Sequence, residues 1–249
     1  MPFWLSHYSK FFESCDLHVH SDDSIDNTEE LCRAAGTEFY AIPRGTIAIG
    51  KNDRYIKCVI TDLLERYECV LFAESPDDII TPDLSHGHDL NSYIKEFLSS
   101  SDTHRFLSGI NIIQSRDESL YDPALGTLIS QRKHAIRCPQ YDNPFLWKTT
   151  PLWGRGWHDL GGNRLVGMGD VQGDEKRLYN MHIHYADFEL ANKRHHVRQQ
   201  TYNKERQTAY ASYVDDKLRD VMDEMLARPS YWFSGGHTFL IPDWAKSII

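Results

Sequence analysis

Five consecutive apolar residues, Cys69 to Ala73, form the segment that most constrains the fold of this 249-residue chain. An apolar run of this length without polar alternation is typical of a strand buried on both faces of a parallel sheet. The residues before it repeat at helical spacing: Ile56, Val59, Ile60, Leu63 and Leu64. We therefore expect a helix over Tyr55 to Tyr67 that leads into a central strand, as in an α/β domain.

Helical and strand patterns alternate over the first half of the chain. Strands are predicted over residues 16–20, 39–42, 69–73, 106–113 and 181–185, and helices over 4–12, 28–36, 55–67, 90–98, 188–202 and 208–227. This order favours an α/β fold with an open, mixed but mostly parallel sheet flanked by helices. We expect one α/β domain over residues 1–202 and a C-terminal helical extension over 203–249 that packs on it.

The charge and the cysteines of the chain exclude several classes of protein. There are 36 Asp and Glu against 27 Lys and Arg, a formal charge of −9, which argues against a broad nucleic-acid surface. No apolar run approaches the roughly 18 residues that span a bilayer. We therefore expect a cytoplasmic protein without a signal peptide or transmembrane segment. The five cysteines have no paired spacing and are predicted to be buried thiols in a reducing compartment.

Acidic residues follow two of the predicted strands. Ser21 to Thr28 follows the first strand, and Glu74 to Asp83 follows the apolar run. Ligands of open α/β sheets bind outside the carboxyl ends of the strands, where paired carboxylates can hold a divalent ion that neutralises a diphosphate. The alternative is a pair of solvated turns, because Asp and Ser favour turns without any ligand.

Four segments, in order, carry a resemblance to a known family. They are Phe3-Trp4-Leu5 through Asp22-Asp23-Ser24-Ile25-Asp26-Asn27-Thr28, Tyr67 through Pro82-Asp83, Lys148 through His158, and Met181 through Arg194. Together they resemble bacterial family 2 glycosyltransferases over residues 3 to 200, including the "D-D-x-S-x-D-x-T" and "D-x-D-E" loops of that family. The resemblance implies a GT-A fold and transfer of a sugar, with inversion, from a nucleotide-sugar donor to the hydroxyl of a glycan or other acceptor.

The resemblance also implies which residues contact the donor. The residues that match the loop meeting the nucleoside are Asp22, Asp23 and Asp26. The cations of the third segment stand beside tryptophans and glycines, a combination that suits sugar stacking and phosphate pairing: Lys148, Arg155 and His158. The alternative for that segment is a local aromatic core.

The second acidic loop is implied to hold Mn²⁺ or Mg²⁺ on the sugar diphosphate. Two ungapped alignments place either Glu74 with Pro76, or Ser75 with Asp77, opposite the two aspartates of the family. One inserted residue places three acids there instead: Glu74, Asp77 and Asp78. A histidine from the second half of the chain often completes the coordination in this family, which assigns that role to His182 or His184, with structural hydrogen bonding as the alternative.

Two features of the resemblance are incomplete. No motif identifies the general base that deprotonates the acceptor, for which the candidates are Asp117, Glu118 and Asp170. Family members also carry a first strand before the helix at Trp4, where only Met1-Pro2-Phe3 stand here. The expectation is either a shortened chain or a reduced sheet.

A competing resemblance starts at Asp16-Leu17-His18-Val19-His20-Ser21, which is similar to the opening metal motif of PHP phosphoesterases. On a strand, His18 and His20 share one face and can chelate a metal. The Thr-Asp-His motif expected after the next strand is replaced by Pro43-Arg44-Gly45. The simpler interpretation is a strand end with hydrogen-bonded imidazoles.

A third alternative is a non-catalytic sugar-nucleotide-binding protein. His195 and His196 are predicted to lie on a solvated helix face.

Overall fold

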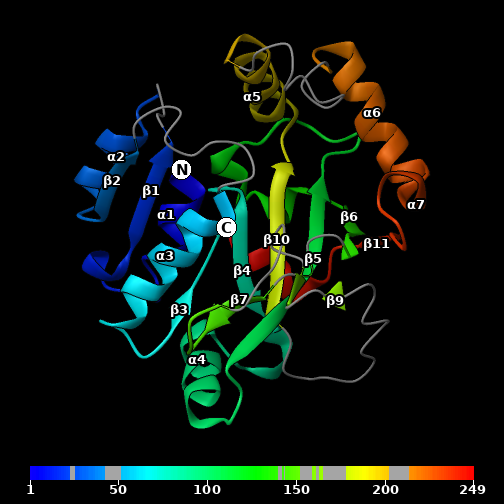
Figure 1. Ribbon diagram of the computed structural model, residues 1–249. Helices are drawn as coiled ribbons and strands as arrows, with labels where there is room; N and C mark the ends of the chain where they lie inside the picture. Colours follow the sequence, from blue (N-terminus) through cyan, green and yellow to red (C-terminus); the bar gives the residue numbers. More distant parts are fainter. Residues whose placement is uncertain are drawn as a thin grey trace. The chain divides into compact units, whose positions relative to one another are not determined.

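The computed structural model describes residues 1–22, 26–42, 52–139, 142, 144–151, 159–160, 163–164, 178–201 and 213–249. The chain forms two compact units (Figure 1). Unit 1 comprises Met1–Leu107 and Asp142–Leu178, and unit 2 comprises Ser108–Tyr141 and Tyr179–Ile249. This division differs from the predicted segments 1–202 and 203–249. Both units contain helices and strands, so the mixed α/β class is confirmed.

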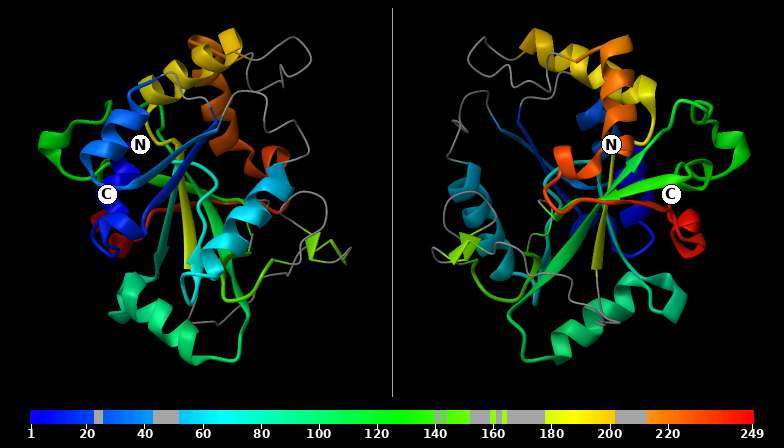
Figure 2. Two further views of the ribbon diagram at one scale, coloured as in Figure 1. Left: turned by 60° about the vertical axis from the view of Figure 1, so that its left-hand side comes forward. Right: turned by 90° about the vertical axis from the view of Figure 1, so that its right-hand side faces the viewer.

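Unit 1 contains a parallel strand–helix–strand motif that follows its first two helices. Its elements in chain order are α1 (Pro2–Tyr8), η1 (Ser14–Asp16), β1 (His18–Asp22), α2 (Thr28–Ala34), β2 (Glu38–Ile42), α3 (Asn52–Leu64), β3 (Val70–Leu71), β4 (Asp78–Pro82), η2 (Leu84–His86), α4 (Leu90–Ser99), the start of β5 (His104–Ile113), β7 (Pro144–Trp147), β8 (Asp159–Leu160) and β9 (Asn163–Arg164). β1 and β2 are parallel, and α2 connects them. Figure 2 shows the two strands side by side in both views. The helical periodicity of α3 and the strands at β1 and β2 agree with the prediction.

The apolar run that dominates the sequence does not form a central parallel strand. β3 has only two residues, Val70 is buried and Leu71 is half-buried, and the strand pairs antiparallel with β7. Trp147 of β7 and Ile60 of α3 complete the cluster around Val70. The prediction was wrong because an apolar run shows that a segment is buried but does not show which neighbours bury it.

The second acidic loop is in part a strand. β4 starts at Asp78, and all five of its residues are buried. Helix α1 is tied to β4, because the Tyr8 hydroxyl accepts a hydrogen bond from the Ile80 amide at 3.0 Å and donates to the Asp78 carbonyl at 3.1 Å. The largest core cluster of the unit also includes Leu90 and Phe97 of α4. A strand that begins with an acid and ends with Pro82 has little strand signal in its sequence.

Unit 2 is built on a mixed sheet. Its elements are the remainder of β5, η3 (Pro123–Leu125), η4 (Ile129–Gln131), β6 (His134–Arg137), β10 (Leu178–Tyr185), α5 (Phe188–Thr201), α6 (Asp216–Ala227), α7 (Pro229–Trp232), β11 (Thr238–Leu240) and η7 (Asp243–Ser247). β6 is antiparallel to both β5 and β11. β10 is the other neighbour of β5, and the two arrows point the same way in Figure 1. Antiparallel pairs also join β3 with β7, β7 with β5, and β8 with β9. A mostly parallel, GT-A-like sheet is therefore not confirmed.

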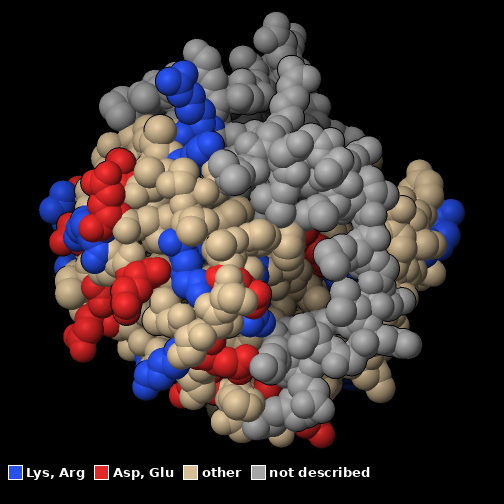
Figure 3. Space-filling view, turned by 60° about the horizontal axis from the view of Figure 1, so that its bottom comes forward, with Lys and Arg blue, Asp and Glu red and all other residues tan. Residues whose placement is uncertain are grey.

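The surface properties of the described residues add three facts. On the face shown in Figure 3, Lys and Arg side chains lie among Asp and Glu side chains. None of the described helices combines the length and apolar character needed to cross a membrane. All five cysteines are free thiols, but only Cys32 and Cys138 are buried, whereas Cys15 and Cys58 are exposed. The expectation of uniformly buried thiols was wrong, because Cys15 in η1 and Cys58 in α3 carry no local sequence pattern that separates them from core thiols.

Candidate functional site

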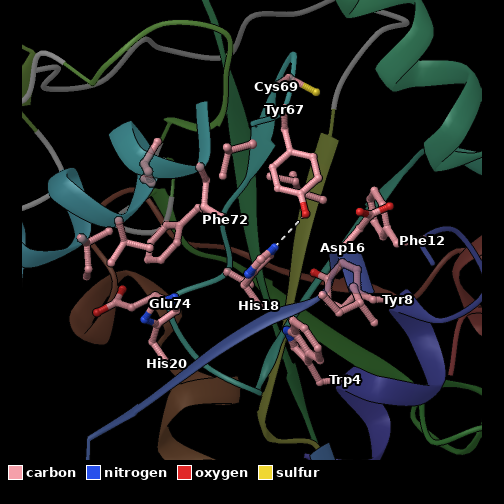
Figure 4. Close-up of a pocket in the computed structure, with 18 of the residues that line it drawn as sticks. Trp4, Tyr8, Phe12, Asp16, His18, His20, Tyr67, Cys69, Phe72 and Glu74 are labelled. Atoms are coloured by element: carbon pink, nitrogen blue, oxygen red, sulfur yellow. Dashed lines mark hydrogen bonds between the residues drawn. The ribbon is translucent and has the colours of Figure 1, made fainter. Parts of the chain in front are cut away.

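A pocket of about 410 Å³ lies in unit 1 between β1 and β3 (Figure 4). We call it the β1–β3 pocket. It is lined by Trp4, Tyr8, Phe12, Asp16, Leu17, His18, His20, Ile42, Tyr55, Ile56, Val59, Ile60, Leu63, Tyr67, Cys69, Val70, Leu71, Phe72, Ala73 and Glu74. Side chains of α1 and α3 thus cover it together with the two strands. Its described lining contains no Lys or Arg, so an anion in it would have no direct cationic partner.

Two hydrogen-bonded histidine–tyrosine pairs form the polar part of the lining of this pocket. His18 Nε2 lies 3.1 Å from the Tyr67 hydroxyl, which is the dashed contact in Figure 4, and His20 Nδ1 lies 2.8 Å from the Tyr55 hydroxyl. Tyr40, on the neighbouring strand, stacks on His20 with ring centroids 4.6 Å apart. This arrangement follows from the parallel register, which sets His20 opposite Tyr40 on one face.

Burial keeps both imidazoles neutral at pH 7. Burial, followed by the charge of His18, lowers the pKa of His20 to about 4. Burial, followed by the charge of Arg66, also lowers the pKa of His18. One nitrogen of each ring contacts a phenol, which favours the interpretation of hydrogen-bonded imidazoles over the PHP-type metal pair. Within the described residues, His18 Nδ1 is buried without a hydrogen-bond partner.

Of the acidic side chains that follow β1, the structure describes that of Asp26, which makes a local hydrogen bond. Asp26 Oδ1 accepts a hydrogen bond from the Thr28 amide at 3.0 Å, at the start of α2. Burial raises the pKa of Asp26, but the hydrogen bonds from Thr28 outweigh this and lower it overall. The side chain of Asp22 and all of Asp23 lie outside the described structure.

The acids after β3 are not a solvated turn. Glu74 is exposed, but Asp77 and Asp78 are each only 4% exposed. Asp78 Oδ2 accepts from the Ser75 amide at 2.9 Å, and the Asp77 amide donates to Ser75 Oγ at 3.1 Å. Burying a carboxylate is costly unless it is paired or coordinates a metal. Both carboxylates are thus removed from solvent, and Asp78 is hydrogen-bonded within the turn, so the alternative of a solvated turn was wrong.

The predicted cation of the third segment caps a helix. Lys148 Nζ donates to the carbonyls of Phe97 at 2.9 Å and Ser100 at 2.7 Å, and it lies 4.6 Å from the centroid of the Phe97 ring. These contacts satisfy the carboxyl end of α4. Arg155 and His158 lie outside the described residues.

The predicted histidines of unit 2 belong to a buried polar group on β10. His182 Nδ1 lies 2.6 Å from Asn111 Oδ1, and the amide of Asn111 donates to Cys138 Sγ at 3.2 Å. The rings of His182 and His184 are parallel within 5°. His184 Nε2 lies 3.3 Å from Nε2 of His195. Metal-binding histidines have such an oxygen partner on the second ring nitrogen, and purely structural histidines have it too, so the contact with Asn111 fits both interpretations of His182.

The prediction of a solvated His195 was wrong. His195 is 1% exposed and faces β10 from α5. Helix α5 has almost no separation of apolar and polar residues, so its buried side carries no sequence signal. Only the spacing of His195 eleven residues after His184 links the two in the sequence, and such spacing is not diagnostic.

The candidate general bases stabilise a turn in unit 2. Asp117 accepts from Lys133 Nζ at 2.8 Å and from the Ser115 hydroxyl at 2.7 Å, and these hydrogen bonds lower its pKa to about 2. Glu118 accepts from the amides of Ser115 and Lys133. A carboxylate with so low a pKa is a poor base at neutral pH. Asp170 lies outside the described residues.

The predicted metal ligands are divided between the units. Unit 1 contains Glu74, Asp77 and Asp78, and unit 2 contains His182 and His184. Neither unit by itself contains the whole predicted set. The residue types fit a divalent ion, since carboxylate oxygens and imidazole nitrogens are both common ligands.

Comparisons with known proteins do not assign the chain to a family. No family model matches it, and neither a curated protein nor a solved structure matches it significantly. The resemblance to family 2 glycosyltransferases therefore stays a prediction from the four sequence segments.

Proposed function

We propose that this protein is a metal-dependent glycosyltransferase that takes its sugar from a nucleotide-sugar donor. The observation that carries the proposal is the placement of carboxylates after β1 and β3, the two strands that line the β1–β3 pocket. Ligands of open parallel sheets bind at the carboxyl ends of strands, and of these two strands β1 has a parallel partner. Asp77 and Asp78 are buried and not part of a solvated turn, and their carboxylates are the ligands that the proposal assigns to the cation.

The charge of the lining residues supports dependence on a metal. A nucleotide sugar carries a diphosphate, and the described lining of the pocket offers the carboxylates of Asp16 and Glu74 but no Lys or Arg. A divalent ion would neutralise that diphosphate as it leaves. Carboxylates alone suit Mg²⁺ or Mn²⁺, whereas histidine ligands favour a transition metal, so Mn²⁺ is the first ion to test.

A non-catalytic sugar-nucleotide-binding protein is the second candidate. The observation that favours it is the engagement of Asp117 and Glu118 in turn hydrogen bonds, which leaves the proposed transfer without an assigned base among the described residues. The two candidates share donor binding and differ in whether nucleotide is released.

Thermal unfolding against a panel of UDP, GDP and dTDP sugars, with Mn²⁺ or with chelator, tests the proposal. A donor at about 100 times its Kd stabilises the fold by about 2.7 kcal/mol, which raises the Tm of a chain of this size by about 5–10 °C. We expect this shift only with metal. Release of nucleotide in the presence of an acceptor separates the enzyme from the binding protein. The absence of a shift with every donor in Mn²⁺ would contradict both.

A further inference from the structure

Three histidines of unit 2 lie where β10 meets α5. His182 and His184 are two residues apart on β10, and their rings are parallel within 5°. His195 is on α5, the helix that begins beyond the end of β10 in Figure 1, and its ring contacts that of His184. All three residues belong to unit 2. We call them the β10–α5 histidine cluster.

The distance between two of these imidazoles is that of two ligands on one metal ion. Nε2 of His184 and Nε2 of His195 lie 3.3 Å apart, and the two ring planes are inclined at 56°. Two nitrogens that each lie about 2.0–2.1 Å from a tetrahedral ion are about 3.3–3.4 Å apart. The alternative at this distance is an N–H···N hydrogen bond between the rings. Measurements of metal binding separate the two interpretations.

Hydrogen bonds fix the tautomer of the third imidazole. The Asn111 amide nitrogen donates to Cys138 Sγ, so its Oδ1 atom is the one that faces His182 Nδ1 at 2.6 Å. Oδ1 only accepts, so Nδ1 carries the hydrogen and Nε2 of the neutral ring carries the lone pair. A ring nitrogen of His182 lies within 4.8 Å of one of His184. His182 is the half-buried member of the cluster, so its side chain has the most room to turn toward a shared ion.

The ligand types favour a transition metal over Mg²⁺. Asp187, the acid between β10 and α5, accepts hydrogen bonds from the amides of Tyr121 and Leu190. The cluster itself therefore offers imidazole nitrogens. Imidazole suits Zn²⁺, Cu²⁺ and Ni²⁺, whereas Mg²⁺ prefers oxygen ligands. His184 and His195 are 4% and 1% exposed, so an ion between them would be shielded from bulk water.

We propose that His182, His184 and His195 bind one transition-metal ion of the class of Zn²⁺ and Co²⁺ through their ring nitrogens. His195 is the new member of this set, since the resemblance assigns a role only to His182 or His184. Three histidines leave the fourth position of the ion to an oxygen of water or substrate. The proposal rests on the proposed function, because it names ligands for the metal of that transferase. Its test uses the metal alone, so the two proposals can fail separately.

Spectroscopy with Co²⁺ tests the proposal on the full chain. Co²⁺ replaces Zn²⁺ in nitrogen sites, and a four-coordinate site gives it strong visible absorption. We expect one Co²⁺ per chain, and in competition we expect Zn²⁺ to bind more tightly than Mn²⁺. The chain also has five free thiols, and a Co²⁺–thiolate site would instead add a strong near-ultraviolet band.

Variants of single histidines test the ligands. His195→Gln and His182→Gln should each lower the affinity for Zn²⁺ at least about tenfold in titration calorimetry, because each removes a nitrogen ligand. The matched control is His237→Gln, which should bind Zn²⁺ like the wild type, because His237 is an exposed residue of unit 2. If His195→Gln does not fold, X-ray absorption of the Zn²⁺-loaded wild type gives a second measurement. It should show three imidazole nitrogens at about 2.0–2.1 Å.

Three results would overturn the proposal. They are the absence of a bound ion in the wild type, a thiolate band with Co²⁺, and unchanged affinity for Zn²⁺ in His195→Gln. The last result would leave the contact between His184 and His195 as a hydrogen bond. Metal binding by the cluster without a shift in Tm by any nucleotide sugar would contradict the transferase and support this site. A donor-dependent shift that His195→Gln retains in full would do the reverse.

Discussion

At the scale of single residues, burial lowers the pKa of His7, His18 and His20. His7 is 2% exposed, and Nε2 lies 2.9 Å from the Ile80 carbonyl, to which the neutral ring donates. Burial lowers the pKa of His7 to about 4, although the hydrogen bond to Ile80 opposes the shift. The unfolded chain therefore binds a proton on His7 near pH 6.5 that the folded chain does not bind until about pH 4.

His7 should make the fold sensitive to acid. Since the folded pKa is lowered, the stability contributed by neutral His7 is present above pH 6.5 and is lost as the pH falls toward 4. The free energy of unfolding should drop by about 2 kcal/mol between pH 7 and pH 5 through this residue. Urea unfolding of His7→Gln, which keeps a donor for Ile80 but does not titrate, should show a drop smaller by this amount.

The control for this measurement is Asn91→Gln, because Asn91 is exposed and its side chain does not titrate. Its pH dependence should equal that of the wild type. A His7→Gln protein with the full wild-type drop would show that another group causes the acid sensitivity.

At the scale of elements, α4 is capped by residues that lie far apart in the sequence. Asp89 Oδ1 accepts from the Ser92 amide at its start, as the Asp-x-x-Ser order indicates. Lys148 satisfies the carbonyls at its end from fifty residues away. The first cap is a local property of the sequence, whereas the second exists only because β7 ends beside α4.

Lys148→Met should destabilise the fold and not act through donor binding alone. The charge-assisted hydrogen bonds to Phe97 and Ser100 are worth about 1–2 kcal/mol of unfolding free energy. Chemical denaturation measures the loss directly. Lys95→Met, at an exposed position of the same helix, is the matched control and should change stability by less than about 0.5 kcal/mol. If the stability of Lys148→Met equals that of the wild type while donor affinity falls, Lys148 contacts the phosphate as the resemblance implies.

At the scale of the whole molecule, the predicted ligands come from two units that interleave along the chain. Asp77 belongs to unit 1 and His184 to unit 2. Both side chains are 4% exposed, so each is removed from solvent within the folded chain. The metal prediction can thus be tested by one substitution in each unit.

Asp77→Asn should lower the affinity for Mn²⁺ by at least about tenfold, because the substitution keeps the size of the side chain and removes its charge. Titration calorimetry measures the change, and His184→Gln tests the predicted ligand of unit 2 in the same way. Asp62→Asn, on the exposed side of α3, should bind Mn²⁺ like the wild type. Unchanged affinity of Asp77→Asn would remove the second acidic segment from the metal site.

The local pattern of the sequence determined the elements whose signal is contained within one segment. The spacing of the apolar residues predicts helix α3. Strand alternation and turn residues predict the order of β1, α2 and β2. The shared face of His18 and His20 follows from the two-residue period of a strand. The class of the fold, mixed α/β, required no more than this order of elements.

The tertiary structure alone decided which partner each segment meets. The run Cys69 to Ala73 is buried only in part, whereas a fully buried strand was predicted. It pairs antiparallel with β7, a strand more than seventy residues away, and no local pattern predicts that partner. The burial of Asp77, Asp78 and His195 depends likewise on packing that leaves no periodic trace in the sequence. The β1–β3 pocket likewise depends on how α1 and α3 pack beside β1 and β3, and no local pattern of the sequence specifies that packing.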